Sequence, residues 1–279
     1  MDRGKQLMSA NLISSLLSCP ELAEGPAVLL FGGPYVVLDG RRLEVPEGSK
    51  RLLAFITLNA RPVDRQHVAG CLWPTGSDQR AAGNLRSALW RLKCAGINVI
   101  ESDKCSLTLR NGTVVDIRVV SEWAARLIDG SAAQSDLCPV FWPADAMDLL
   151  PGWYDDWIIF ERERIRHRLL HALEALSRRL IEAGRCAEAV DAAISAVGVD
   201  PLRESATRIL VEAHLAEGNL VEGHRAYERY RDTVRSELGV EPSRQLTDLV
   251  RATISSQRRL PWRGIAGEAR QLAAAQGRP

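Results

Sequence analysis

The chain has 279 residues, of which 46% are hydrophobic and 25% are charged, and its formal net charge at pH 7 is +1. These proportions describe an ordinary soluble globular chain, and the length predicts two domains that can each bury a core. The charge is unevenly placed, because residues 26–116 carry a net charge of +4 and residues 151–250 a net charge of −4. We therefore expect the two halves to bind different partners.

Several classes of protein are disfavoured by what the sequence lacks. It has no run of about 18 apolar residues, so we predict no membrane span. Residues 1–25 are expected to form a poorly ordered leader rather than a signal peptide. The six cysteines are scattered without a CxxC pair, which favours free thiols over a zinc or redox site, although a cluster formed only in the fold remains an alternative.

In the first half of the chain, the predicted strands and helices follow one another in a recognisable order. Strands are predicted at Val28–Phe31, Tyr35–Leu38 and Arg42–Val45, separated by glycine-containing turns. Three helices follow: one from Ser49, one from the N-cap Asp64 to Pro74, and one over Asp78–Ala95. Further strands are predicted at Asn98–Ile100, Leu107–Leu109 and Thr113–Ile117, with a tight turn at Asn111-Gly112. Strands, three helices and a closing hairpin together predict a winged helix-turn-helix over residues 26–117.

The third helix has two opposite faces at 100° per residue. The apolar face comprises Ala81, Leu85, Ala88, Leu89 and Leu92. The polar face comprises Arg80, Asn84, Ser87, Trp90 and Arg91, with Arg86 and Lys93 on a flank. A helix that reads a DNA major groove needs phosphate-pairing charge and donors for base edges, although a solvated basic face is the alternative. The helical wheel alone makes Asn84 and Trp90 base-reading candidates, with Trp90 placed to touch a thymine methyl or to cover the neighbouring wing.

This half resembles the OmpR/PhoB-type winged helix found at the front of SARP-type bacterial regulators. The resemblance is carried by the leading strands, Leu72-Trp73-Pro74, Leu85-Arg86 and Arg91-Leu92-Lys93, whereas Cys105-Ser106-Leu107 replaces the usual Gly-Tyr-x-Leu of the wing. It implies that Ser87, Arg91 and Lys93 read bases. We expect phosphate contacts from Arg80, Arg86, Lys104 and Arg110.

The second half contains an internal repeat. We expect an irregular linker at Ser131–Ala146 within a connecting segment, residues 118–148, and then a long amphipathic helix from Ile165 through Leu180. Ile181–Gly184 and Leu215–Gly218 are similar four-residue segments offset by 34 residues, the period of tetratricopeptide (TPR) repeats. Later helices are predicted from Asp200-Pro201 and from Glu241-Pro242-Ser243, with Gly239 ending the helix between them.

This half resembles the bacterial transcriptional activation domain (BTAD) of SARP-type regulators. The resemblance is carried, in order, by LLPGWYDDW, ERER, EAGR, DPLRE and ELGVEPS. We therefore predict an α+β winged helix-turn-helix domain followed by an all-α TPR-like domain at residues 149–256 and a tail at residues 257–279. Two interpretations of Trp153, Tyr154 and Trp157 stay open, docking against the neighbouring domain and a small-molecule pocket, and docking is favoured.

The resemblance implies a cytoplasmic, nucleoid-associated activator that binds double-stranded promoter DNA, forms a homodimer and recruits RNA polymerase holoenzyme. Two alternatives stay open: a TPR-type protein-interaction scaffold, and a ligand-sensing regulator with little intrinsic DNA specificity. No cofactor or enzyme activity is predicted, because neither GxxxxGK[ST] nor GxSxG occurs. His167 and His171 have the spacing of metal ligands but no HExxH glutamate, so we interpret them as surface residues.

Overall fold

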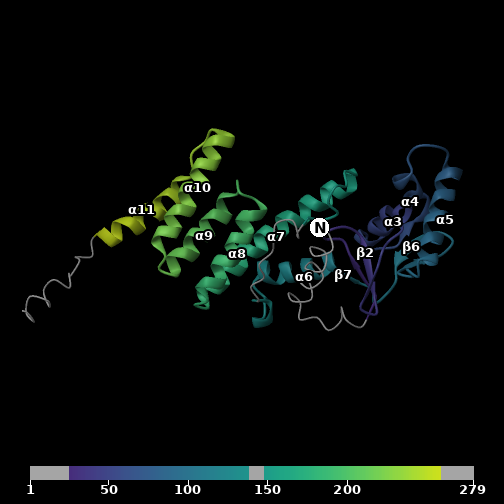
Figure 1. Ribbon diagram of the computed structural model, residues 1–279, viewed down its shortest axis with the longest axis horizontal. Coiled ribbons are helices and arrows are strands. Elements are labelled where there is room, and N and C mark those ends of the chain that lie inside the picture. The colour runs from purple at the N-terminus through teal and green to yellow at the C-terminus, as the bar shows by residue number, and fades with distance from the viewer. Residues whose placement is uncertain (1–24, 138–147, 259–279) are drawn as a thin grey trace, which may run out of the picture.

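The computed structural model describes residues 25–137 and 148–258, with side chains up to residue 252. The molecule is elongated, with a winged-helix domain at one end and an array of helices at the other (Figure 1). The predicted α+β domain followed by helical repeats is confirmed. Within the described part of the chain, no helix is both long and apolar enough to cross a membrane.

A four-stranded sheet opens the fold. Its strand order is β3 (Arg41–Leu43), β2 (Tyr35–Leu38), β1 (Ala27–Leu29) and β7 (Val114–Val115). The β2–β3 hairpin turns at Asp39 and Gly40, which have φ angles of +48° and +71°. Positive φ at both central residues matches the right-handed twist of the flanking strands, so the Asp-Gly signal predicted this hairpin correctly.

Three helices and a second sheet complete the winged helix. The helices are α3 (Glu47–Leu58), α4 (Arg65–Leu72) and α5 (Asp78–Cys94), and the sheet contains β4 (Val63–Asp64), β6 (Ser106–Leu109) and β5 (Ile100–Ser102) in that order. Asp64 caps α4 as predicted, because its Oδ1 accepts a hydrogen bond from the His67 backbone N–H at 2.9 Å. The wing is the β5–β6 hairpin.

The strand predicted after the tight turn at Asn111-Gly112 forms, but it does not belong to the wing. The turn forms, but β7 leaves the wing and pairs in parallel with β1. The strand is also shorter than predicted, since Asp116 begins a helix that the sequence reading missed, α6 (Asp116–Asp129). The Asp116 carboxylate is buried and accepts the backbone N–H groups of Leu30 and Phe31 at 2.7 and 2.9 Å. Those bonds satisfy the end of β1 and hold the start of α6 against it.

A short segment after the connection joins the two domains. Leu149 forms an antiparallel bridge with Phe31, and the Leu150 N–H donates to the Leu30 carbonyl at 3.1 Å. Arg162 donates to the carbonyls of Leu149 and Leu150 at 2.9 and 2.7 Å. One apolar core therefore runs through the joint. Of the predicted linker, residues 134–136 form a 3₁₀ turn, and residues 138–147 lie outside the described residues, as do the leader up to residue 24 and the tail from residue 259.

The helical array consists of five helices in the described residues. They are α7 (Asp156–Glu182), α8 (Cys186–Val199), α9 (Glu204–Ala216), α10 (Leu220–Leu238) and α11 (Arg244–Arg258). The repeat is visible in the turns, because Gly184 and Gly218 have φ angles of +73° and +85° at equivalent positions. Two predicted helix starts are wrong. Helix α7 begins at Asp156 rather than at Ile165. Helix α9 begins at Glu204 rather than at Asp200-Pro201, because Pro201 lies in a turn.

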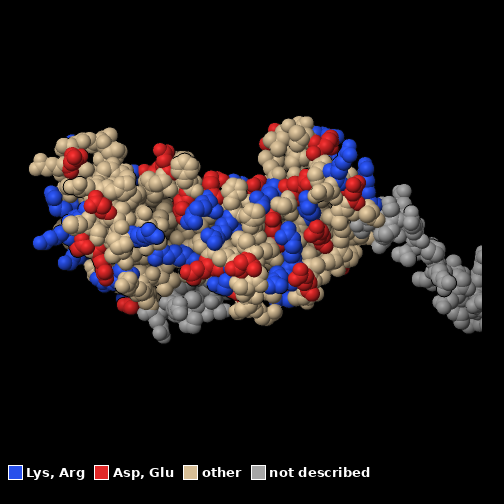
Figure 2. All heavy atoms as spheres, turned by 180° about the vertical axis from the view of Figure 1, so that it is seen from behind, with Lys and Arg blue, Asp and Glu red and all other residues tan. Residues whose placement is uncertain are grey.

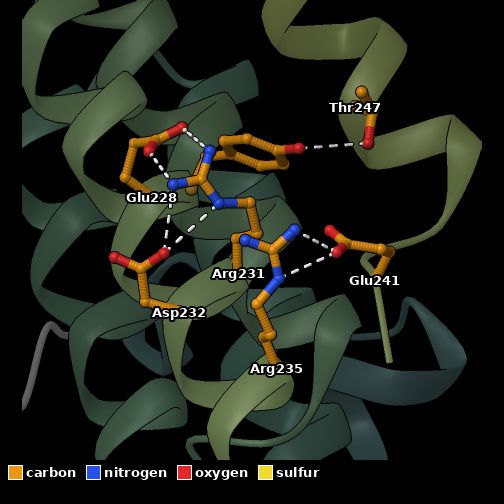
Figure 3. A network of polar contacts seen from close by, with 7 residues as sticks. Glu228, Arg231, Asp232, Arg235, Glu241 and Thr247 are labelled. Atoms are coloured by element: carbon orange, nitrogen blue, oxygen red, sulfur yellow. Dashed lines mark hydrogen bonds and ion pairs between the residues drawn. The ribbon is translucent and has the colours of Figure 1, made fainter. Parts of the chain in front are cut away.

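The last described helix is attached by polar contacts (Figure 3). The Tyr227 hydroxyl on α10 lies 3.2 Å from Thr247 Oγ1 on α11. Arg235 near the end of α10 pairs with Glu241 in the connecting turn. Gly239 ends α10 in the left-handed conformation, with φ of +67°, as predicted. These contacts fix the angle at which the chain re-enters a helix.

Candidate nucleic-acid interface

Helix α5 is held by its apolar face. Ala81, Leu85, Ala88 and Leu92 are buried, as the helical wheel predicted, and Leu89 is half-buried. The Ser49 hydroxyl on α3 donates to the Ala88 carbonyl at 2.8 Å in the core between the two helices. This contact sets the rotation of α5 about its axis, and so determines which side chains point outward.

The opposite face of α5 is open to solvent. Arg80, Arg86, Ser87, Trp90, Arg91 and Lys93 are exposed, and Asn84 is half-buried. Trp90 has 66% of its surface exposed, so it does not cover the wing. None of these arginines and lysines pairs with a carboxylate of the described residues. Of the predicted base-reading residues, Ser87, Trp90 and Arg91 therefore lie on the accessible polar face, with Asn84 half-buried at its edge and Lys93 on its flank.

Arg91 lies across the start of α3. A Cβ atom added to Gly48 would lie 2.5 Å from Arg91 Nη1, so the flexible end of the Arg91 side chain rests against this glycine. Sequence reasoning could not have found this contact, since the two residues meet only after α3 and α5 pack.

The wing presents two predicted phosphate contacts in different surroundings. Lys104 at the turn is exposed and has no carboxylate partner among the described residues, whereas Arg110 Nε lies 3.7 Å from Glu101 on the neighbouring strand. Asp103 shapes the turn, because its carboxylate accepts the backbone N–H groups of Cys105 and Ser106 at 2.7 and 2.6 Å. These hydrogen bonds from Ser106 and Cys105 hold the pKa of Asp103 below its usual range. The Asp103 carboxylate therefore binds backbone groups of the turn itself.

An open cleft lies between α4, α5 and the wing. It is lined by residues of all three elements, including Arg65, Gln66, Gln79, Arg86 and Lys104. Arg65 also fixes the wing, since its guanidinium bonds the Ser102 hydroxyl and donates to the Asp103 carbonyl at 3.2 Å. Sequence reasoning missed Arg65 and Gln66, because their place beside the wing depends on the pairing of β4 with β6.

In the helical domain, many charged side chains form ion pairs with one another. Several of its arginines pair with acids one turn away, as in Arg164–Glu161, Arg185–Glu188, Arg225–Glu222 and Arg231–Glu228, whereas the exposed Arg178 and Arg229 have no ion pair among the described residues. Figure 2 shows basic side chains projecting at the winged-helix end and mixed red and blue side chains over the array. His171 contacts Arg203 at 3.2 Å, and no cluster of potential metal ligands occurs in the described residues.

The three aromatic residues before and within α7 do different things. Trp157 packs edge-to-face on Phe55 of α3, with ring centroids 5.1 Å apart, so the predicted domain docking is confirmed for this residue. Trp153 is half-buried, and its carbonyl accepts from Arg162 at 3.1 Å. Tyr154 is 80% exposed and does not dock, which corrects the prediction for it.

Comparisons with known proteins agree with this architecture. Residues 128–253 match the family model of the bacterial transcriptional activator domain, which covers the end of α6 and the helical array. The regulatory protein AfsR of Streptomyces griseus is 25% identical over 215 residues, 73% of this chain and 22% of AfsR. The chain therefore spans about a fifth of that relative's length.

A solved structure shows the same fold. Mycobacterium tuberculosis EmbR, in complex with a low-affinity phosphopeptide, aligns with a TM-score of 0.57 and 17% identity, over 83% of this chain and 65% of that one. The family is one of transcriptional regulators rather than an enzyme class. Together these comparisons support a SARP-type transcriptional regulator with an N-terminal winged-helix domain and a bacterial transcriptional activator domain.

Proposed function

We propose that this protein binds double-stranded promoter DNA through α5 and the wing and activates transcription by recruiting RNA polymerase holoenzyme. The observation that supports this best is the outer face of α5, where exposed cations have no carboxylate partner among the described residues. In solution such charges repel one another, and a phosphate backbone would neutralise them. Homodimers would allow two such helices to contact a repeated site.

The roles within the interface follow from position. Asn84, Ser87, Trp90, Arg91 and Lys93 are proposed to read bases, because they lie along the exposed side of the helix that would enter the groove. Phosphate contacts are proposed for Arg80 in the first turn of α5, for Arg86 on the flank of its polar face, and for Lys104 and Arg110 on the wing. Arg65 would support the wing through Ser102 and the Asp103 carbonyl.

A mobility-shift titration on promoter fragments tests the base-reading assignment. Arg91→Ala should lower the binding free energy for the preferred site by about 1–3 kcal/mol and blur the preference between sites. The matched control is Arg225→Ala on α10, an exposed arginine that pairs with Glu222. If Arg91→Ala changes neither affinity nor preference, the assignment is wrong.

The same titration separates the alternatives. A TPR-type scaffold would retard DNA weakly and without regard to sequence. A ligand-sensing regulator would show thermal stabilisation by a metabolite. The unpaired cations of α5 favour DNA binding over both.

A further inference from the structure

Helix α7 begins with an exposed apolar surface that the fold does not use. Phe160 is 77% exposed and Ile159 is 40% exposed. Asp156 and Glu163 are exposed and lie one turn before and after them, so the four residues share the outer side of the helix. We call Asp156, Ile159, Phe160 and Glu163 the α7 patch. Ile158, Ile165 and Leu169 are buried on the opposite side.

The α7 patch is held rigidly beside the winged-helix domain. Trp157, between its members, packs on Phe55, and Arg51 of α3 pairs with Asp155 at the helix start. Arg162 donates to three carbonyls of the preceding turn. A preformed surface loses little conformational entropy when a partner binds, which favours its use as a recognition site.

The charge of the patch defines its partner. Asp156 has no ion-pair partner among the described residues, and Glu163 has a single long contact of 3.4 Å with Arg166, which also lies 3.3 Å from Asp200. An apolar centre between carboxylates repels DNA phosphates and attracts a protein surface with apolar side chains flanked by lysine or arginine.

We propose that the α7 patch docks a basic, amphipathic segment of RNA polymerase holoenzyme. This rests on the proposed function, because that function requires a polymerase contact outside the DNA-binding face. Phe160 is the anchor of the contact, since large aromatic side chains dominate the binding energy at the centre of interfaces. Asp156 and Glu163 set the orientation of the basic segment.

The test measures polymerase binding and DNA binding separately. Host RNA polymerase holoenzyme, immobilised on a biosensor, is titrated with the full chain in the absence of DNA. Phe160→Ala should weaken binding about tenfold or more, and Phe160→Leu should restore part of the loss. Asp156→Lys should weaken binding and reduce its salt dependence. Val221→Ala, at a 64% exposed apolar residue on α10, is the matched control and should bind as the wild type does.

Each other outcome has a defined meaning. Unchanged binding of Phe160→Ala, or no binding of the wild type, overturns the proposal. If sedimentation shows that Phe160→Ala converts a dimer into a monomer, the patch docks a second copy and the proposal is wrong. Retardation of promoter DNA should be equal for all variants. If the wild type retards DNA without sequence preference, DNA reading fails while the polymerase assay still reports on the patch.

Discussion

The two ends of the molecule differ in how their arginines are balanced. On α5 the exposed cations have no carboxylate partner in the described residues, whereas Arg164 on α7, Arg185 just before α8, and Arg225 and Arg231 on α10 each pair with a glutamate one turn away. Exposed pairs of this kind contribute about 0–1 kcal/mol each and mainly neutralise the surface. An arginine without such a partner remains free to bind an anion outside the chain.

Two buried carboxylates also differ in whether an arginine binds them. Asp116 at the joint is bound by backbone N–H groups alone, whereas Glu174 on α7 is bound by the Arg203 guanidinium at 2.7 Å and the Ser205 hydroxyl at 2.6 Å. Burial raises the pKa of Asp116 to about 7 against the effect of its three donors. Burial also raises the pKa of Glu174, but the bonds from Arg203 and Ser205 outweigh it and the net shift is downward. The direction of the pKa shift of a buried carboxylate therefore depends on whether it has a cationic partner.

The largest effect is expected at Asp116. Asp116→Ala leaves three buried N–H groups without an acceptor and should lower the free energy of unfolding by about 4 kcal/mol. In the wild type the raised pKa gives stability that is present below pH 3.8 and lost as the pH rises to about 7. Urea unfolding, followed by tryptophan fluorescence, measures both. Asp129→Asn, at the exposed end of the same helix, is the control, and equal losses in the two variants would contradict the role of Asp116 as the acceptor for these N–H groups.

Glu174 should behave in the opposite way with pH. Glu174→Gln breaks the partly buried pair with Arg203 and should lower the free energy of unfolding by about 3 kcal/mol. Because the pKa of Glu174 is lowered, its contribution is present above the ordinary value of 4.5 and is lost as the pH falls below it. Urea unfolding followed by circular dichroism, from pH 7 to pH 4, measures the loss. Glu222→Gln removes an exposed pair and should cost less than about 1 kcal/mol; a matching loss there would remove the distinction.

Local signals predicted much of the fold. The periodicity of α5, the Asp64 cap and the glycines at 184, 218 and 239 each depend on a few neighbouring residues, and each appears where expected. Helix α6 was missed although Ile117, Val120, Trp123, Ala124 and Leu127 have helical spacing and are buried. The tight-turn signal at Asn111-Gly112 suggested a continuing strand instead.

The errors come from contacts between distant residues. Pairing of β7 with β1 involves a two-residue strand whose partner lies more than 80 residues earlier, and no local pattern specifies it. In the candidate site too, some features follow from local sequence and others depend on contacts between distant residues. Exposure of Ser87 and Lys93 follows from helix periodicity, but the position of Arg91 over Gly48 and the pairing of Arg110 with Glu101 depend on tertiary packing.

The smallest expected effect compares two arginines of the DNA-binding domain. Arg86→Ala should reduce the slope of log affinity against log salt by about 1, because a freely available charge is lost from a phosphate contact. Arg110 already shares its charge with Glu101 at 3.7 Å, so Arg110→Ala should weaken all sites alike but flatten the slope less. Glu101→Gln should steepen it by releasing Arg110. Mobility-shift titrations at several salt concentrations measure the three slopes. Identical slopes for Arg86→Ala and Arg110→Ala would mean that pairing on the free protein does not decide which cations reach the phosphates, and the contrast between the two ends would then lose its predictive value.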